Sequence, residues 1–131
     1  MHVLSVRFGH TESPASFGSQ GVNVGELRSP HDVAVNVLDG EIYVSDHENN
    51  RISVFDMNGN PLRTIGRHGS GACEFNLPTG LYFDAASSLL LVNDFCNHRI
   101  QMIRPAGSGD LVREFGSRGS GQGQFVWPTA V

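Results

Sequence analysis

The stretch that decides the fold runs from Ser29 to Gly71 and reads SPHDVAVNVLDGEIYVSDHENNRISVFDMNGNPLRTIGRHGSG. From Leu77 the chain repeats the same plan as LPTGLYFDAASSLLLVNDFCNHRIQMIRPAGSGDLVREFGSRGSG. At an offset of 48 residues, Pro30 matches Pro78, Asp46 matches Asp94 and Arg51 matches Arg99. Self-similarity at a fixed period predicts one structural unit per copy, and each unit buries its apolar faces against its neighbours.

Each copy divides into four short apolar segments that are separated by turn residues. Val33, Val35 and Val37 alternate with other residues, which is the side-chain period of a β-strand. Turn sequences such as Asn58-Gly59 supply the residues that tight hairpins need. The predicted strands cover residues 32–37, 41–46, 51–56 and 61–65 in the first copy, and 80–84, 89–94, 99–104 and 111–115 in the second. Four antiparallel strands in about 40 to 50 residues indicate a blade of an all-β propeller.

Gly-rich connectors link the copies and recur at Phe17 to Pro30, Ile65 to Pro78 and Phe115 to Pro128. Glycine permits a tight path between blades, and proline at a strand entrance removes a donor where no partner strand lies. Within a repeat region at 17–131, we expect one blade at 30–66, a second at 78–116 and the first strand of a third at 125–131. Residues 1–16 are expected to hold a loop and the outer strand of a preceding blade, formed by Val3 to Gly9.

The motif carried by both copies closely resembles the NHL repeat. The matching residues are Pro30, Ile42 to Asp46, Asn49 to Asp56 and Asn58-Gly59 in the first copy, and Pro78, Leu91 to Asp94 and Asn97 to Gln101 in the second. The resemblance covers nearly everything from Phe17 onward and implies a six-bladed β-propeller. Two whole blades are fewer than that ring contains, so we expect a fragment of a longer protein. The alternative is that copies of a short chain self-associate to complete a ring.

Composition narrows the classes of function. The net charge is -4 and all nine basic residues are Arg, which disfavours a general binder of polyanions. No apolar run approaches the roughly 18 residues of a membrane-spanning helix, so no membrane partner is expected. Cys73 and Cys96 form no metal-binding pair, which favours free thiols in a reducing, cytoplasmic compartment over a single disulfide. The Gly-rich stretches lack the Lys and the helix that phosphate binding needs, and we expect no cofactor.

The repeat also separates scaffold residues from candidate site residues. Because Asp46 with Arg51 and Asp94 with Arg99 recur at equal spacing, we expect them to be structural pairs that bridge neighbouring blades. Function should lie where the copies differ. The clearest difference is His31, because its counterpart is Thr79. Connectors and strand ends crowd onto one rim of a propeller, and the candidate binding residues there are His31, Arg28, Arg67, His68 and Arg118.

These features favour a non-catalytic scaffold for protein partners over an enzyme, and no residue is assigned a catalytic role. The resemblance to NHL domains of tripartite-motif ubiquitin ligases implies RNA binding as an alternative. Rim arginines, Arg63 among them, would then combine with the aromatic residues Phe75, Phe125 and Trp127. A remoter resemblance, to the propeller of the zinc-dependent peptidyl-hydroxyglycine lyase, would make His31 a metal ligand. Zinc enzymes supply about three protein ligands, and this chain has one at the matching place.

Overall fold

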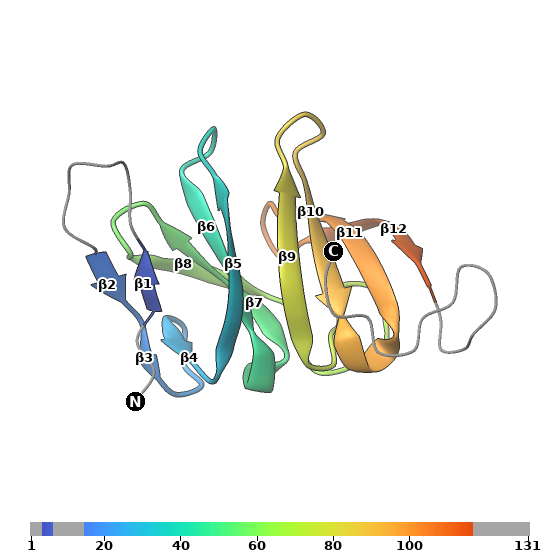
Figure 1. Ribbon diagram of the computed structural model, residues 1–131, viewed down its shortest axis with the longest axis horizontal. Coiled ribbons are helices and arrows are strands. Elements are labelled where there is room, and N and C mark those ends of the chain that lie inside the picture. The colour runs from blue at the N-terminus through green and yellow to red at the C-terminus, as the bar shows by residue number, and fades with distance from the viewer. Residues whose placement is uncertain (1–3, 7–14, 117–131) are drawn as a thin grey trace.

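The protein is all-β in its computed structural model, which describes residues 4–6 and 15–116. Two sheets each contain four antiparallel strands in chain order, and they lie side by side (Figure 1). The first comprises β5 (Pro30–Asn36), β6 (Glu41–Asp46), β7 (Arg51–Asp56) and β8 (Pro61–Ile65). The second comprises β9 (Pro78–Asp84), β10 (Leu89–Asp94), β11 (Arg99–Arg104) and β12 (Asp110–Phe115). The expected fold class, blades of a β-propeller, is confirmed.

The innermost strands begin two residues earlier than the alternation of apolar residues predicted. Pro30 opens β5 and pairs with Asp46, while Pro78 opens β9 and pairs with Asp94. In both blades an irregularity in the register separates this first pair from the rest of the ladder. Proline is tolerated at the start of a strand and at bulges because it has no N–H to give to the ladder. The bulge also interrupts the alternation, which is why the sequence pattern begins only after it.

The second and third strands of each blade are joined by a short 3-10 turn. These turns are η1 (His47–Asn49) and η2 (Phe95–Asn97), and each ends at a residue with left-handed backbone angles. The residue is Asn50 in the first blade, with φ of 55°, and His98 in the second, with φ of 54°. Asn tolerates this conformation better than most residues. The two copies thus keep one turn geometry even where the residue type changes.

An apolar core fills the space between the two blades. Its buried side chains include Tyr43, Val54 and Ile65 from the first sheet and Leu90, Val92 and Ile103 from the second. Phe75, from the connector, is completely buried in the same cluster. Leu27 lies three residues before Pro30, as Phe75 lies three before Pro78, and it is buried in a second cluster with Ile42, Val44 and Phe55. Each connector therefore inserts one apolar side chain beside the blade that follows it.

Four shorter strands precede the first blade. They are β1 (Leu4–Val6) and β2 (Ala15–Phe17), which are antiparallel, and β3 (Ser19–Gln20) and β4 (Glu26–Leu27), which are parallel. Leu4 pairs with Phe17 just as Ile52 pairs with Ile65 and Ile100 with Phe115. By this register β1 corresponds to a third strand and β2 to an outer strand. The outer position that the sequence pattern assigned to Val3 to Gly9 is thus occupied by β2, and residues 125–131 lie outside the described residues.

The turns of the two blades form two rims. The hairpin rim carries residues 37–40, 57–60, 85–88 and 105–109, which join successive strands within a blade. The connector rim, at the opposite ends of the strands, carries η1, η2 and the connectors at 18–29 and 66–77. Figure 1 shows the hairpin between β9 and β10 at the upper edge and the connectors at the lower edge. Strands β5 and β9 contact each other along the junction of the blades.

Replacing Phe75 by Ala tests whether the connector residue holds the two blades together. We expect Phe75→Ala to lower the free energy of unfolding by about 3–5 kcal/mol, because it leaves a cavity among fully buried side chains. Urea denaturation followed by circular dichroism measures the loss. The matched control is Leu38→Ala on the hairpin rim, where the side chain is 73% exposed and the expected change is below about 0.5 kcal/mol. Equal losses in both variants would contradict this role for Phe75.

Candidate interaction surface

A buried carboxylate joins the first connector to the first blade. Asp46 is completely buried at the end of β6. Its Oδ1 accepts the backbone N–H of Arg28 at 2.7 Å, and its Oδ2 accepts Arg51 Nε at 2.8 Å and Asn49 Nδ2 at 3.0 Å. The other guanidinium nitrogens of Arg51 donate to the connector carbonyl oxygens of Val22, Asn23 and Glu26. Asp46 and Arg51 therefore hold the connector against the blade that it enters.

The second blade repeats this arrangement with the corresponding residues. Asp94 Oδ1 accepts the backbone N–H of Asn76 at 2.8 Å, and its Oδ2 accepts Arg99 Nε at 2.7 Å. Arg99 also donates to the connector carbonyls of Gly71 and Glu74, at 2.7 and 2.9 Å. A buried charge is tolerated only when it is paired and hydrogen-bonded, and both copies meet that requirement through the same groups. These two pairs are engaged within the chain.

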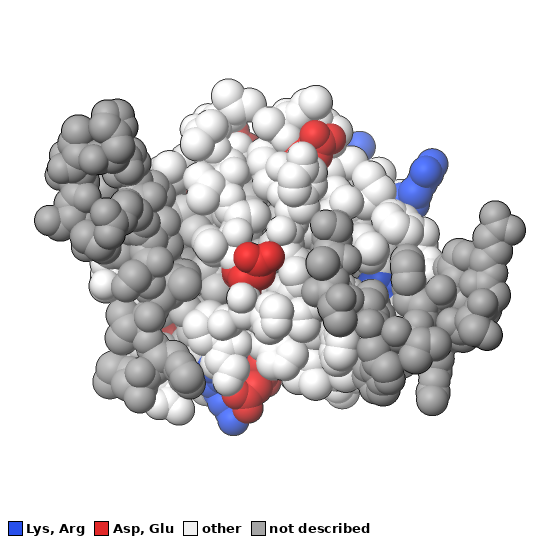
Figure 2. Space-filling model, in the orientation of Figure 1, with Lys and Arg blue, Asp and Glu red and all other residues white. Residues whose placement is uncertain are grey.

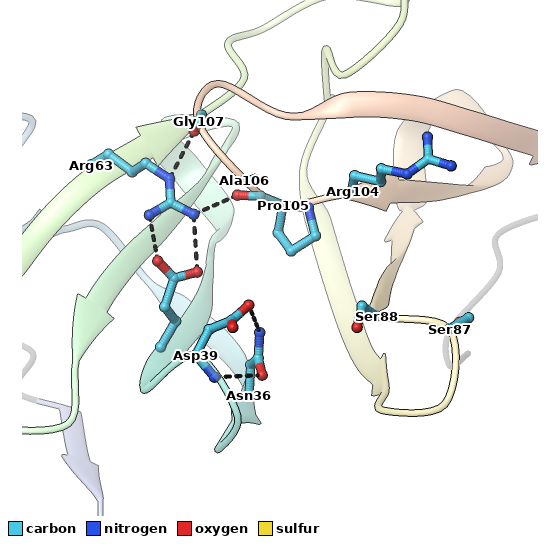
Figure 3. Close-up of a pocket in the computed structure, with 10 residues that line it drawn as sticks. Asn36, Asp39, Arg63, Ser87, Ser88, Arg104, Pro105, Ala106 and Gly107 are labelled. Atoms are coloured by element: carbon cyan, nitrogen blue, oxygen red, sulfur yellow. Dashed lines mark hydrogen bonds and ion pairs between the residues drawn. The ribbon is translucent and has the colours of Figure 1, made fainter.

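A different arginine crosses the junction between the two blades. Arg63, on β8, donates from Nη1 and Nη2 to the carboxylate of Glu41, at 2.6 and 3.0 Å. Its Nε donates to the carbonyl of Gly107 at 2.7 Å, and Nη2 also donates to that of Pro105, so it binds the β11–β12 hairpin of the next blade. Figure 3 shows the guanidinium beside Gly107. Arg63 is a candidate for RNA contact in the sequence analysis, but all three of its guanidinium nitrogens donate hydrogen bonds at the junction.

Charge and burial at this junction shift two pKa values. The hydrogen bonds from Arg63 hold the pKa of Glu41 below its usual range, against a smaller opposing effect of burial. Burial raises the pKa of Tyr43, whose hydroxyl donates to Glu41 Oε1 at 2.9 Å. Glu41 is therefore ionised and Tyr43 neutral near neutral pH, which is the state that the observed hydrogen bonds require.

A cavity of about 320 Å³ adjoins Arg63 on the hairpin rim. We call it the Arg63 cleft, and it is lined by Asn36, Asp39, Arg63, Ser88 and Arg104 among others. Asn36 donates to Asp39 and to the Tyr43 hydroxyl, at 3.0 and 3.1 Å. In Figure 3 the Arg104 side chain extends away from Arg63. The groups that the first blade contributes to this cleft are hydrogen-bonded to one another. We therefore regard the cleft as part of the structural junction between the blades.

A second cavity, of about 280 Å³, opens on the connector rim and contains the clearest residue predicted from the sequence. We call it the His31 pocket, and it is lined by His31, His47, Thr79 and Phe95. The rings of the two His residues have their centroids 5.7 Å apart, and His47 Nδ1 lies 3.0 Å from the carbonyl oxygen of Pro78 in the next blade. His47 is therefore fixed by the junction, while His31 is exposed beside it.

The other predicted rim residues have different surroundings. Arg28 has an exposed side chain on the first connector, and His68 is exposed on the second connector. Arg67 is exposed but forms an ion pair with Glu74, at 2.8 Å, which lowers the pKa of that carboxyl. Phe75 is completely buried and offers no face for base stacking. Arg118, Phe125 and Trp127 lie outside the described residues.

Two residues of the pocket, His47 and Phe95, were not among the binding residues predicted from the sequence. His47 and Phe95 each follow the recurring Asp, 48 residues apart, just as His31 and Thr79 each follow the recurring Pro. The pairing of Pro30 with Asp46 and of Pro78 with Asp94 brings these following positions together. The repeat therefore contains the information that identifies these pocket residues. Recognising them also requires the pairing between the first and second strands of a blade, which brings those positions together.

The described residues offer limited means for metal or thiol chemistry. Among them, no group of three or more His, Cys, Asp or Glu side chains could hold a metal ion. The zinc-lyase hypothesis has two imidazoles here, one fewer than the about three ligands of a typical zinc enzyme. Cys73 and Cys96 are free, and burial raises the pKa of both thiols, which lowers their reactivity.

A membrane-spanning helix is not found in the part of the chain that the structure describes.

Comparison with known proteins agrees with the repeated architecture. The sequence profile of the NHL repeat matches residues 27–55, which run from the end of the first connector through β5 and β6 into β7. The chain is also 40% identical to RING finger protein nhl-1 of Caenorhabditis elegans over 78 residues. That match covers 60% of this chain and 8% of the relative, so the chain corresponds to a small part of that protein.

The two blades and their recurring Asp–Arg pairs define the class of protein as a segment of a β-propeller with four-stranded repeats. The profile match places one NHL repeat at residues 27–55 of this chain.

Replacing Asp94 by Asn tests the buried carboxylate. We expect Asp94→Asn to lower the free energy of unfolding by about 3 kcal/mol, because it removes the buried carboxylate paired with Arg99 Nε and leaves the partly exposed Glu114 as the remaining counter-charge of that guanidinium. The matched control is Asp110→Asn, at an exposed position that opens β12, with an expected change below about 0.5 kcal/mol. Chemical denaturation of both variants gives the comparison, and a stable Asp94→Asn protein would show that the charge is dispensable.

The Glu41–Arg63 pair predicts a dependence on pH. Because the pKa of Glu41 is lowered in the folded state, its contribution to stability is complete above its unfolded value of about 4.5 and is lost as the pH falls through the folded value. We therefore expect the difference in unfolding free energy between the wild type and Glu41→Gln to shrink below pH 4.5. Urea denaturation at several pH values between about 3 and 7 measures it. A difference that stays constant over that range would contradict the ionic character of the contact.

Proposed function

We propose that this NHL segment is a non-catalytic interaction module that binds protein partners on its connector rim, around the His31 pocket. The observation that carries the proposal is that the polar groups which recur in both copies and those which differ between the copies have different surroundings. Those that recur, Asp46 with Arg51 and Asp94 with Arg99, are engaged in holding the connectors. Those that differ between the copies, His31 and Thr79, line an open cavity with His47 and Phe95. A surface that varies on a repeated frame is where a specific partner would be recognised.

The composition of this rim supports a protein partner over RNA. Binding to phosphates would need several available Arg side chains on one surface. Here Arg51 and Arg99 donate to connector carbonyls, and Arg67 is paired with Glu74. In Figure 2, the viewed face carries scattered single charges, with no continuous field of Lys or Arg outside the grey residues. Phe75, which would stack with a base, is buried.

The comparisons support a more specific role. The relative from Caenorhabditis elegans is a RING finger protein, and the sequence motif of the two copies resembles that of NHL domains in tripartite-motif ubiquitin ligases. We propose that the module selects the protein that such a ligase modifies. The two free cysteines support an origin in a reducing compartment such as the cytoplasm.

Capture experiments with two rim variants test the binding surface. The protein is immobilised as wild type, as the Arg28→Ala and His31→Ala double variant, and as the control Arg104→Ala on the hairpin rim, whose side chain is also exposed. Proteins retained from cell extract are quantified by mass spectrometry, with and without nuclease. We expect a set of proteins that the wild type and the control retain equally, and that the double variant retains about thirtyfold less, the scale of one interface hot spot.

Two results would contradict the proposal. Equal retention by the double variant and the wild type would remove the connector rim as the binding surface. Loss of retention after nuclease treatment, together with a steep decrease of binding as salt is added, would indicate RNA instead. Circular dichroism of each variant verifies that the fold is intact.

A further inference from the structure

The His31 pocket contains a hydrogen-bonding group that has no partner in the folded chain. Thr79 is only 6% exposed, and its hydroxyl oxygen forms no hydrogen bond although the residue lines the pocket. Buried polar side chains are hydrogen-bonded in most proteins, so an exception requires an explanation. The cavity of about 280 Å³ beside Thr79 could hold a bound group that supplies the missing partner.

The contact between His47 and the next blade fixes the hydrogen-bonding character of the imidazole ring. His47 Nδ1 lies 3.0 Å from the carbonyl oxygen of Pro78, and because a carbonyl can only accept, Nδ1 carries the proton. In the neutral ring Nε2 is then an acceptor, and none of the described residues donates to it. The Pro78 carbonyl belongs to the peptide bond that leads to Thr79, so the acceptor and the unpaired hydroxyl lie on neighbouring residues of the pocket.

The lining of the pocket indicates which kind of side chain it takes. Among the described residues that line it, none is Asp, Glu, Lys or Arg, so a charged ligand group would lack a fixed counter-charge. His31 and Phe95 are planar residues, against which an aromatic ring packs favourably. Tyr is the neutral aromatic side chain that both donates and accepts a hydrogen bond, whereas Trp only donates and Phe does neither.

We propose that the His31 pocket binds a tyrosine side chain of the protein partner, an inference that rests on the proposed function. The ring of that tyrosine packs against His31 and Phe95, and its hydroxyl donates to His47 Nε2. Thr79 completes the site by rotating about its Cα–Cβ bond between staggered positions, which turns its hydroxyl toward the cavity, where it donates to the tyrosine oxygen. Tyr is one of the residue types that most often dominate binding energy by filling pockets at interfaces.

Nuclear magnetic resonance titrations of the full 131-residue chain test the assignment. The two probes are N-acetyl-tyrosinamide and N-acetyl-phenylalaninamide, which differ only in the hydroxyl group. Binding is followed by the chemical shifts of the four residues that line the pocket. We expect the tyrosine probe to bind at least about fivefold more tightly, as for the gain of one or more hydrogen bonds.

Two variants separate the two hydrogen bonds. His47→Asn keeps a donor for the Pro78 carbonyl but removes the acceptor, and Thr79→Val replaces the unpaired hydroxyl by a methyl group. Each should weaken binding of the tyrosine probe about fivefold and leave binding of the phenylalanine probe unchanged. Thr79→Val should also resist urea at least as well as the wild type, because it loses no hydrogen bond. The matched control is Thr64→Val on β8, outside the pocket, and it should bind both probes like the wild type.

Equal binding of the two probes to the wild type, or shift changes only outside the four lining residues, would overturn the inference whether or not a variant folds. Unchanged binding of the tyrosine probe in both pocket variants would overturn it as well. Any of these results would leave the proposed function standing if the capture experiment still retains proteins on the connector rim. Selective binding of the tyrosine probe with no protein retained from extract would support tyrosine in the pocket and count against the proposed function alone.

Discussion

Each blade is organised around one carboxylate that lies in its interior. A buried negative charge is costly unless several donors surround it, and Asp46 and Asp94 each take donors from three different parts of the chain. The connector supplies a backbone N–H, the 3-10 turn supplies an Asn side chain and the third strand supplies an Arg. The path of the connector, the shape of the turn and the start of the third strand are therefore coupled to one another. This coupling explains why these residue types recur at one spacing.

The same requirement explains which parts of the fold could be predicted from the sequence. Strand periodicity and turn residues are local signals, and the eight predicted strands of the two blades lie within one residue of where the structure has them, apart from the starts of β5 and β9. Those starts were missed because a bulge separates Pro30 from the alternating residues that follow. The recurrence of Asp46 and Arg51 marked them as a pair, but their partners in the connector are mostly backbone atoms. Backbone donors and acceptors carry no residue-type signal.

The candidate site was predictable only in part, for a related reason. His31 stood out because its counterpart is Thr79, a difference that can be read directly from the repeat. His47 and Phe95 complete the pocket through a pairing between two strands, and Arg63 completes the junction through carbonyl oxygens more than forty residues away in the chain. Contacts of this kind depend on how the blades are placed together. A single sequence indicates which residues are unusual, whereas the fold decides which of them meet.

The hairpin rim and the connector rim, at the two ends of a junction, differ in how their polar groups are hydrogen-bonded. This difference affects which rim could recognise a specific partner. On the hairpin rim, Glu41, Arg63 and the hairpin carbonyls form a closed set of hydrogen bonds, so a ligand there would have to displace contacts that stabilise the fold. On the connector rim, the His31 pocket is framed by side chains that change from one blade to the next, while the backbone beneath them is fixed by the Asp–Arg pairs. A partner can gain contacts at this rim without breaking any of the hydrogen bonds that hold the connectors. On this rim the recurring residues keep the backbone rigid, while the exposed side chains can vary. A repeat module needs both properties in order to recognise different partners on one architecture.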